Sequence, residues 1–126
     1  MGDFKKLLVW RKAHALALNV HRVSARIRGT HLAALRSQLV RTAMSIPANI
    51  VEGKGQRSPR VLGRFLRYAV QSGAELEYHL IVARDLEVIA RTDFSSLLGQ
   101  LLETRKMLHG LLAHVDPQQP GDTTDA

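Results

Sequence analysis

The chain has 126 residues, 45% hydrophobic and only 5% aromatic, so a single domain with an aliphatic core is expected. It has no cysteine, which excludes disulfides, thiolate metal sites and cysteine nucleophiles. With no apolar run near the ~20 residues of a membrane span and no signal-peptide pattern, a basic cytoplasmic protein of formal net charge +7 without a membrane partner is predicted.

The first helical pattern covers residues 9–27, where apolar side chains recur at alternating steps of four and three. Gly29 is a natural stop, and Thr30 is suited to be the N-cap of the next helix. The second pattern covers residues 32–53 and ends in a Gly-Lys-Gly run. Both patterns predict amphipathic helices with one apolar face.

Pro47 lies inside the second pattern, where a proline removes one helical hydrogen bond and should kink the helix. Beside the apolar face runs an ordered polar row, which we interpret as a structural seam between helices or subunits. A half-satisfied network of this kind would be costly, so most members should be bonded if buried. The predicted structural polar network, with its partners on the third helix, is Gln38, Arg41, Ser45, Asn49, Glu52, Ser72 and Glu75.

Ser58 and Pro59 are a good N-cap and first helical residue for the third pattern, which is predicted to be the longest helix. The fourth pattern opens near Thr92 and stops at Pro117, and residues 117–126 read as a disordered tail. Short connections make successive helices antiparallel. The prediction is therefore all-α: an up-down-up-down four-helix bundle over residues 1–116.

The positive charge is concentrated at the start of the chain: residues 1–58 carry 11 cations and two anions, and residues 92–126 carry two cations and five anions. Thirteen of the 18 cations are arginine, which pairs bidentately with phosphate. Four arginines recur at steps of three and four around the start of the third helix, where they oppose the helix dipole. The predicted nucleic-acid-binding residues are Arg22, Arg26, Lys54, Arg57, Arg60, Arg64 and Arg67.

An alternative reading of the arginines is structural: they would pair with acidic residues of a neighbouring subunit, and the protein would be an interaction scaffold. The candidates for such pairing are Glu75, Glu77, Asp85 and Glu87. A catalytic role is not predicted, because no nucleophile has an obvious nearby base and no metal-ligand spacing occurs. We therefore expect no enzyme activity, no metal and no cofactor.

Three stretches carry a family resemblance. Residues 8–13 (LVWRKA) resemble the L-x-V-W-Q-K-A opening of the small bacterial proteins first named from intervening sequences in 23S rRNA genes. Residues 38–53 resemble the family's Q-L-x-R-A-A-x-S-I-P-x-N-I-A-E-G stretch, and residues 65–76 resemble F-L-x-I-A-x-G-S-x-x-E-L. The sequence departs from the pattern at Val40, at Gln71-Ser72 and in its Arg-rich surface.

The resemblance implies a four-helix bundle that assembles into a ring, a homopentamer. It also implies kinship with the accessory variability determinant proteins of diversity-generating retroelements, which are thought to bind a reverse transcriptase and nucleic acid. From the charge and the resemblance together we expect a non-enzymatic oligomer that binds nucleic acid, RNA in preference to DNA. A reverse transcriptase or another RNA-handling enzyme is the candidate partner.

Overall fold

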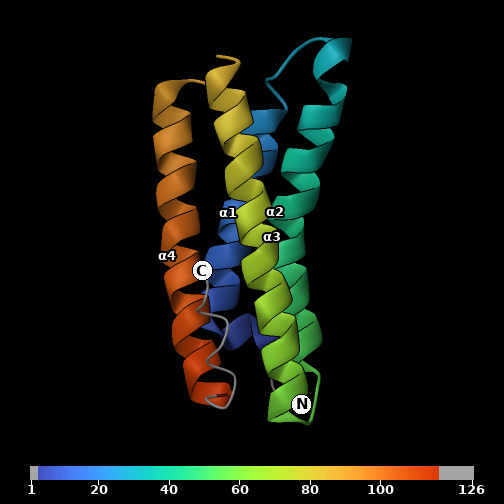
Figure 1. Ribbon diagram of the computed structural model, residues 1–126, viewed down its shortest axis with the longest axis vertical. Coiled ribbons are helices and arrows are strands. Elements are labelled where there is room, and N and C mark those ends of the chain that lie inside the picture. Colours follow the sequence, from blue (N-terminus) through green and yellow to red (C-terminus); the bar gives the residue numbers. More distant parts are fainter. Residues whose placement is uncertain (1–2, 117–126) are drawn as a thin grey trace.

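The computed structural model describes residues 3–116, and every regular element in that range is helical. The helices run alternately up and down along one long axis (Figure 1). The four long elements are α1 (Leu8–Ser24), α2 (Ala33–Lys54), α3 (Pro59–Asp85) and α4 (Arg91–Val115), and the 3-10 helices are η1 (Phe4–Lys6) and η2 (Thr30–Leu32). Successive helices pack together and α1 also packs against α4, which confirms the antiparallel four-helix bundle. The tail predicted for residues 117–126 lies outside the described residues.

The core is aliphatic and comes from the predicted apolar stripes of all four helices. Leucine, isoleucine, valine and alanine make up every buried hydrophobic position among the described residues. Thr42 and Thr104 are the least exposed of the buried polar residues, and each donates its hydroxyl to a carbonyl one turn earlier in its own helix, at 2.7 and 2.9 Å. Their hydrogen bonds are therefore satisfied without a partner on another helix. No helix in residues 3–116 is long and apolar enough to cross a membrane.

Helix α2 continues through Pro47, which is buried. A proline at this point leaves the carbonyl of Ala43 without its helical donor. The bend of α2 expected at Pro47 stays a prediction. Ile46 before Pro47 and Ile50 after it are almost completely buried, so this part of α2 packs into the core.

The helix ends agree only in part with the capping signals, because α1 ends at Ser24, before Gly29, and only α3 of the four long helices begins with a side-chain cap. Ser58 caps α3 by accepting from the backbone N–H of Val61, at 3.4 Å. The expected N-cap at Thr30 is wrong, because Thr30 opens η2 and α2 begins after Leu32 with no side-chain cap. Instead, Arg36 holds the α1–α2 connection by donating to the carbonyl oxygens of Ile27 and Gly29, each at 2.9 Å.

The alternating topology defines two ends of the bundle (Figure 1). The upper end contains the α1–α2 and α3–α4 connections. The lower end contains η1, the α2–α3 connection and the end of α4. Helix direction alone therefore separates the last turn of α1 from the first turn of α3 by the length of the bundle, and this separation decides how the predicted arginines are distributed.

Candidate nucleic-acid interface

Three arginines stand exposed at the lower end: Arg57 in the α2–α3 connection, and Arg60 and Arg64 on the first turns of α3. None of the three forms an ion pair with a carboxylate within residues 3–116. The first turn of α3 also contains no acidic residue. Because a helix N-terminus is itself positive, it repels these cations. A bound anion would relieve this repulsion, so the site favours one.

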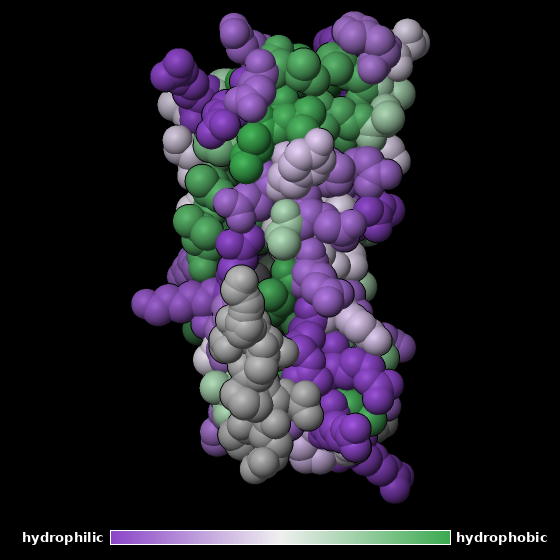
Figure 2. Space-filling model, in the orientation of Figure 1, coloured by the Kyte–Doolittle hydropathy of each residue, from purple (hydrophilic) through white to green (hydrophobic). Residues whose placement is uncertain are grey.

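Lysines extend the same end. Lys54 is the last residue of α2 and is half-buried, and Lys5 and Lys6 of η1 are exposed. Figure 2 shows hydrophilic residues gathered over the first half of α3 and hydrophobic ones near its last turns. We call the surface formed by these six cations the lower cationic end; its residues are Lys5, Lys6, Lys54, Arg57, Arg60 and Arg64.

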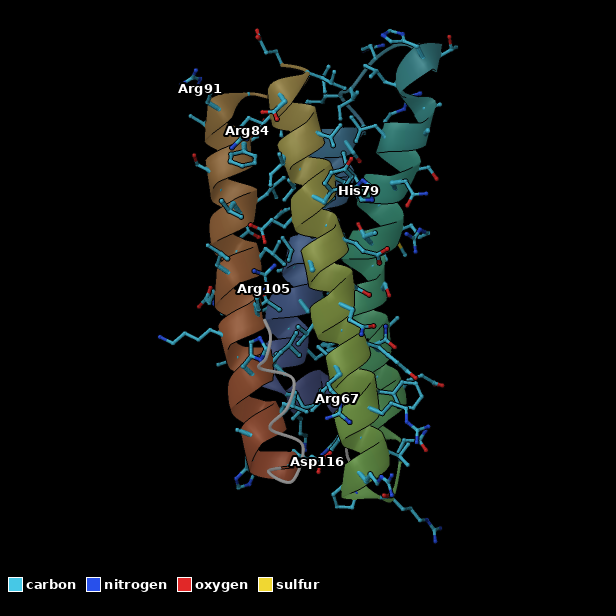
Figure 3. The ribbon with its side chains drawn as sticks, viewed as in Figure 1. Arg67, His79, Arg84, Arg91, Arg105 and Asp116 are labelled. Carbon is cyan, nitrogen blue, oxygen red and sulfur yellow. The ribbon has the colours of Figure 1, made fainter. Side chains whose placement is uncertain are left out.

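Arg67 differs from the other arginines of α3 because it is engaged within the chain. Its Nη1 atom lies 3.5 Å from Oδ2 of Asp116, directly after α4, and the side chains are 24% and 8% exposed. In Figure 3 the two residues lie at the lower end of the bundle, Arg67 on α3 and Asp116 next to the end of α4. This ion pair joins two helices and removes Arg67 from the exposed arginines.

Arg22 and Arg26 lie at the opposite, upper end of the bundle. Arg22 donates to Oδ1 of Asn19 at 2.8 Å, and Arg26 pairs with Asp93 of α4 at 2.9 Å. Asn19 in turn donates to Gln100 of α4 at 2.9 Å. These side chains line a groove of about 310 Å³ between α1 and α4. The seven predicted residues therefore form two separate groups, as the up-down topology alone would have indicated.

The polar row of α2 meets α3 along the outer edge of their contact. The Ser45 and Ser72 hydroxyls lie 2.7 Å apart, and the Asn49 amide donates to the Ser45 carbonyl at 2.8 Å and to its hydroxyl at 3.1 Å. Nearer the upper end, Arg41 donates to Gln38 and lies 3.7 Å from Glu75. The structure brings these members together.

The same row is more exposed than a buried seam would be. Ser72 is its one buried member, whereas Arg41, Glu52 and Glu75 are exposed. The Glu52 side chain makes no hydrogen bond within the described part of the chain, and only its carbonyl accepts, from Gln56. The row therefore combines a small bonded cluster with a solvated rim.

His79 borders this rim, and among the titratable groups of residues 3–116 it is the one with a clearly displaced pKa. Partial burial lowers the pKa of His79 below the 6.5 of an exposed histidine, the nearby Glu75 carboxylate raises it, and Arg41 lowers it. Desolvation is the largest of these effects, so the neutral imidazole is favoured.

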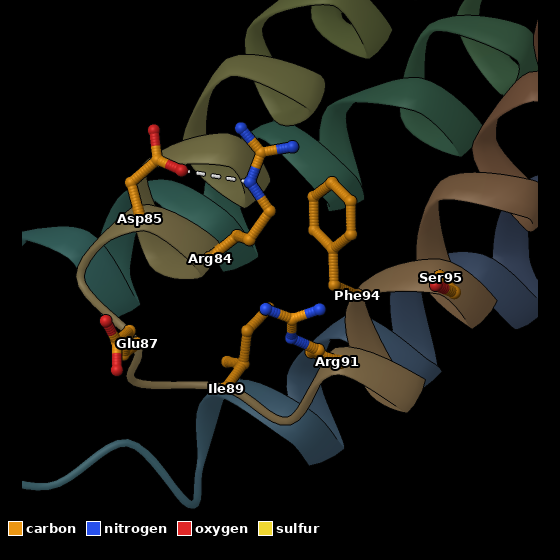
Figure 4. A pocket seen from close by; sticks show the side chains of 7 residues that line it. All are labelled: Arg84, Asp85, Glu87, Ile89, Arg91, Phe94 and Ser95. Carbon is orange, nitrogen blue, oxygen red and sulfur yellow. Dashed lines mark hydrogen bonds and ion pairs between the residues drawn. The ribbon is translucent and has the colours of Figure 1, made fainter.

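A hollow at the upper end was not predicted. It has a volume of about 690 Å³ and lies around the α3–α4 connection, where the Arg84 guanidinium stands 5.0 Å from the Phe94 ring centre (Figure 4). Arg84 also contacts Asp85 at 2.9 Å, and Glu87 and Arg91 complete the charged lining. The sequence indicated only a charged turn at this position, not a hollow. Because the two cations are matched by two anions, this hollow lacks the net charge of the lower cationic end.

Among residues 3–116, no three histidine, aspartate or glutamate side chains are grouped so as to hold a metal ion. The six cations of the lower cationic end have no ion-pair partner within residues 3–116, and they outnumber the exposed carboxylates of Asp3 and Glu52 beside them.

The bundle is similar to known proteins in sequence and in fold. Residues 5–110 match the family model described as 23S rRNA-intervening sequence protein. The fold is similar to that of a protein of unknown function from the S23 ribosomal protein family of Bacteroides thetaiotaomicron, with a TM-score of 0.78 and 24% identity over 83% of this chain and 98% of that chain. At this identity the likeness shows the fold alone. The search of curated proteins found no match.

Proposed function

The chain belongs to the family of 23S rRNA-intervening sequence proteins, and from that premise we propose that it binds nucleic acid, RNA in preference to DNA, through the lower cationic end. The observation that carries the proposal is the exposure of Arg57, Arg60 and Arg64 without an acidic partner in the described chain. Binding would be non-enzymatic and would need no cofactor. The setting proposed is the cytoplasm.

The physical basis is electrostatic. Each guanidinium can pair with a phosphate through two parallel hydrogen bonds, and pairing releases counterions condensed on the nucleic acid. Arg60 and Arg64 lie one turn apart on the same face of α3, and Arg57 precedes them in the connection. A phosphate backbone running along this face would replace three repulsive cation contacts with attractive ones.

Assembly would strengthen the interaction. The proposal includes a homo-oligomer, a pentamer in line with the family resemblance, and five copies would carry five times the formal charge of +7. Such a field raises the rate of association with an anionic polymer. A reverse transcriptase or another RNA-handling enzyme is the proposed partner for which this protein would be an accessory factor.

The experiment is a binding titration of a labelled RNA hairpin at low salt, read by fluorescence anisotropy. The wild-type protein should bind, and the triple variant R57A/R60A/R64A should bind much more weakly, because the substituted side chains are exposed and lack ion-pair partners in the described structure. Circular dichroism should show that the variant keeps its helices. Negligible wild-type binding at low salt would contradict the proposal.

A second candidate function is a protein-interaction scaffold, favoured by a hydrophobic area near the last turns of α3. Leu86, directly after α3, is 54% exposed, and Figure 2 shows hydrophobic colouring near the last turns of α3. In such a scaffold the exposed arginines would serve subunit contacts instead of binding RNA. Charge reversal at Arg60 and Arg64 should then change the mass of the oligomer, measured by light scattering, before it changes any RNA affinity.

A further inference from the structure

An aromatic ring accompanies the exposed arginines of α3. Tyr68 follows Arg64 by four residues, which places the two side chains next to each other on the helix surface. The Tyr68 side chain is 42% exposed, although a tyrosine at the side of a bundle helix could have been covered by the neighbouring helix. An exposed ring is thus adjacent to cations that have no acidic partner among the described residues.

The Tyr68 ring packs against a second aromatic side chain. Phe65 meets Tyr68 edge to face, with ring centroids 5.6 Å apart and planes at 90°. Phe65 lies where α2 and α3 approach closely, since a Cβ atom added to Gly53 would lie 3.0 Å from the Phe65 Cβ atom. The contact with Phe65 restricts the Tyr68 ring, so that stacking a flat partner on it should cost less conformational freedom.

We infer that the lower cationic end binds an unpaired nucleic-acid strand, with a base stacked on Tyr68 and neighbouring phosphates on Arg60 and Arg64. This inference rests on the proposed function and names its substrate class. In a duplex the faces of the bases are hidden by stacking, so Tyr68 could reach only the backbone. In an unpaired strand every base offers a free face, and stacking on aromatic rings is the usual device by which proteins hold such strands.

The ring and the guanidinium groups together favour an unpaired strand over a duplex. Arginines alone would serve a duplex equally well, because their contacts go to phosphates. Arg60 and Arg64 are about 6 Å apart along α3 at 1.5 Å per residue, and Tyr68 continues the same row by another turn. One short strand can therefore meet two guanidinium groups and then the ring.

The chain supplies a matched control in Tyr78. It is on the same helix and is more exposed, at 61%, but it lies about 15 Å further along, beyond the lower cationic end. Its ring contacts His79, and Glu75 precedes it by one turn. A general effect of removing a surface tyrosine should appear at both positions, whereas stacking should appear only at Tyr68.

The experiment compares a 12-nucleotide oligouridine with an RNA duplex of equal length, at one low salt concentration, for the full chain and its variants. For Tyr68→Ala we expect about a tenfold or greater loss of affinity for oligouridine, in line with alanine substitutions at stacking rings. Its duplex affinity should change less than twofold. Tyr68→Phe and Tyr78→Ala should bind both ligands like the wild type, and a 12-nucleotide oligothymidine tests whether DNA is held in the same way.

The outcomes separate this inference from the proposed function. If Tyr68→Ala weakens duplex and single strand equally, or neither, while R60A/R64A weakens both, the unpaired-strand inference fails and the proposed function stands. If the wild type binds neither ligand, the proposed function itself fails. A changed oligomer mass for Tyr68→Ala, with no selective loss of oligouridine binding, would assign the ring to a subunit contact and overturn the inference.

Discussion

The Arg67 Nη1 atom lies 3.5 Å from the Asp116 Oδ2 atom, and both atoms are shielded from solvent without a hydrogen bond to any described protein group. The distance exceeds that of a good charge-assisted hydrogen bond, so the attraction is mainly Coulombic. The pair connects the lower part of α3 to the end of α4. It gives Arg67 a structural role next to arginines for which we propose a binding role.

Removing one member of this pair should destabilise the bundle. The Asp116 carboxylate is 8% exposed in the wild type and loses its counter-charge in Arg67→Ala, so we expect a loss of about 2 kcal/mol in the free energy of unfolding. Fully buried pairs lose about 3–5 kcal/mol, and Arg67 is still 24% exposed, so its desolvation is less complete. Urea unfolding followed by circular dichroism measures the difference.

The double variant R67M/D116L is the control for that measurement. Replacing both charges with apolar side chains of similar size should restore most of the lost stability, because no buried charge is left unpaired. If Arg67→Ala unfolds at the same urea concentration as the wild type, the ion pair does not hold α4 against α3.

Gly63 is required by the position of Asp116. A Cβ atom at residue 63 would lie 2.8 Å from Asp116 Oδ2 and 2.9 Å from its Cβ, so Gly63→Ala should displace the end of α4 and cost about 1–3 kcal/mol. Gly99→Ala is the matched change, since nothing lies within 4 Å of its added Cβ and alanine favours the helix by about 1 kcal/mol. Because both substitutions gain the same helix propensity, Gly63→Ala should unfold at a lower temperature than Gly99→Ala; equal shifts would contradict the packing.

Stability should fall in mild acid because of His79. Its folded-state pKa is lowered, so between that value and the 6.5 of the unfolded chain the unfolded state binds more protons. The stabilisation that depends on neutral His79 is fully present above pH 6.5. It is lost as the pH falls from 6.5 through the folded-state pKa. His79→Gln should consequently lose less stability than the wild type between pH 7.5 and pH 5, measured by urea unfolding. An NMR titration of the His79 ring with a midpoint above 6.5 would contradict this.

Periodicity and capping predicted most of the fold. The apolar steps of four and three placed the core, and the Ser58-Pro59 pair marked the start of α3. The α1–α2 connection could not be predicted in the same way. Arg36 stabilises it by donating hydrogen bonds to backbone carbonyls, and Thr30 does not cap α2. Hydrogen bonds to carbonyl oxygens leave no residue pattern in a single sequence.

The candidate site was predicted in part. Spacing showed that Arg60, Arg64 and Arg67 share one side of α3, but it could not show that Asp116 occupies the last of them, since that pairing depends on how α4 packs. The position of Arg22 and Arg26 at the other end followed from the topology and was within reach of the sequence. The exposure of Tyr68 was not, because it depends on the angle at which α2 and α3 meet.

The most direct test of nucleic-acid binding by the lower cationic end is the salt dependence of RNA affinity. For single-stranded RNA, the slope of log K against log salt should become shallower by about 2 in R57A/R60A/R64A, since each lost phosphate contact removes about 0.7. R22A/R26A, at the upper end, should keep the wild-type slope. An unchanged slope in the triple variant, or an equal change in R22A/R26A, would contradict the account.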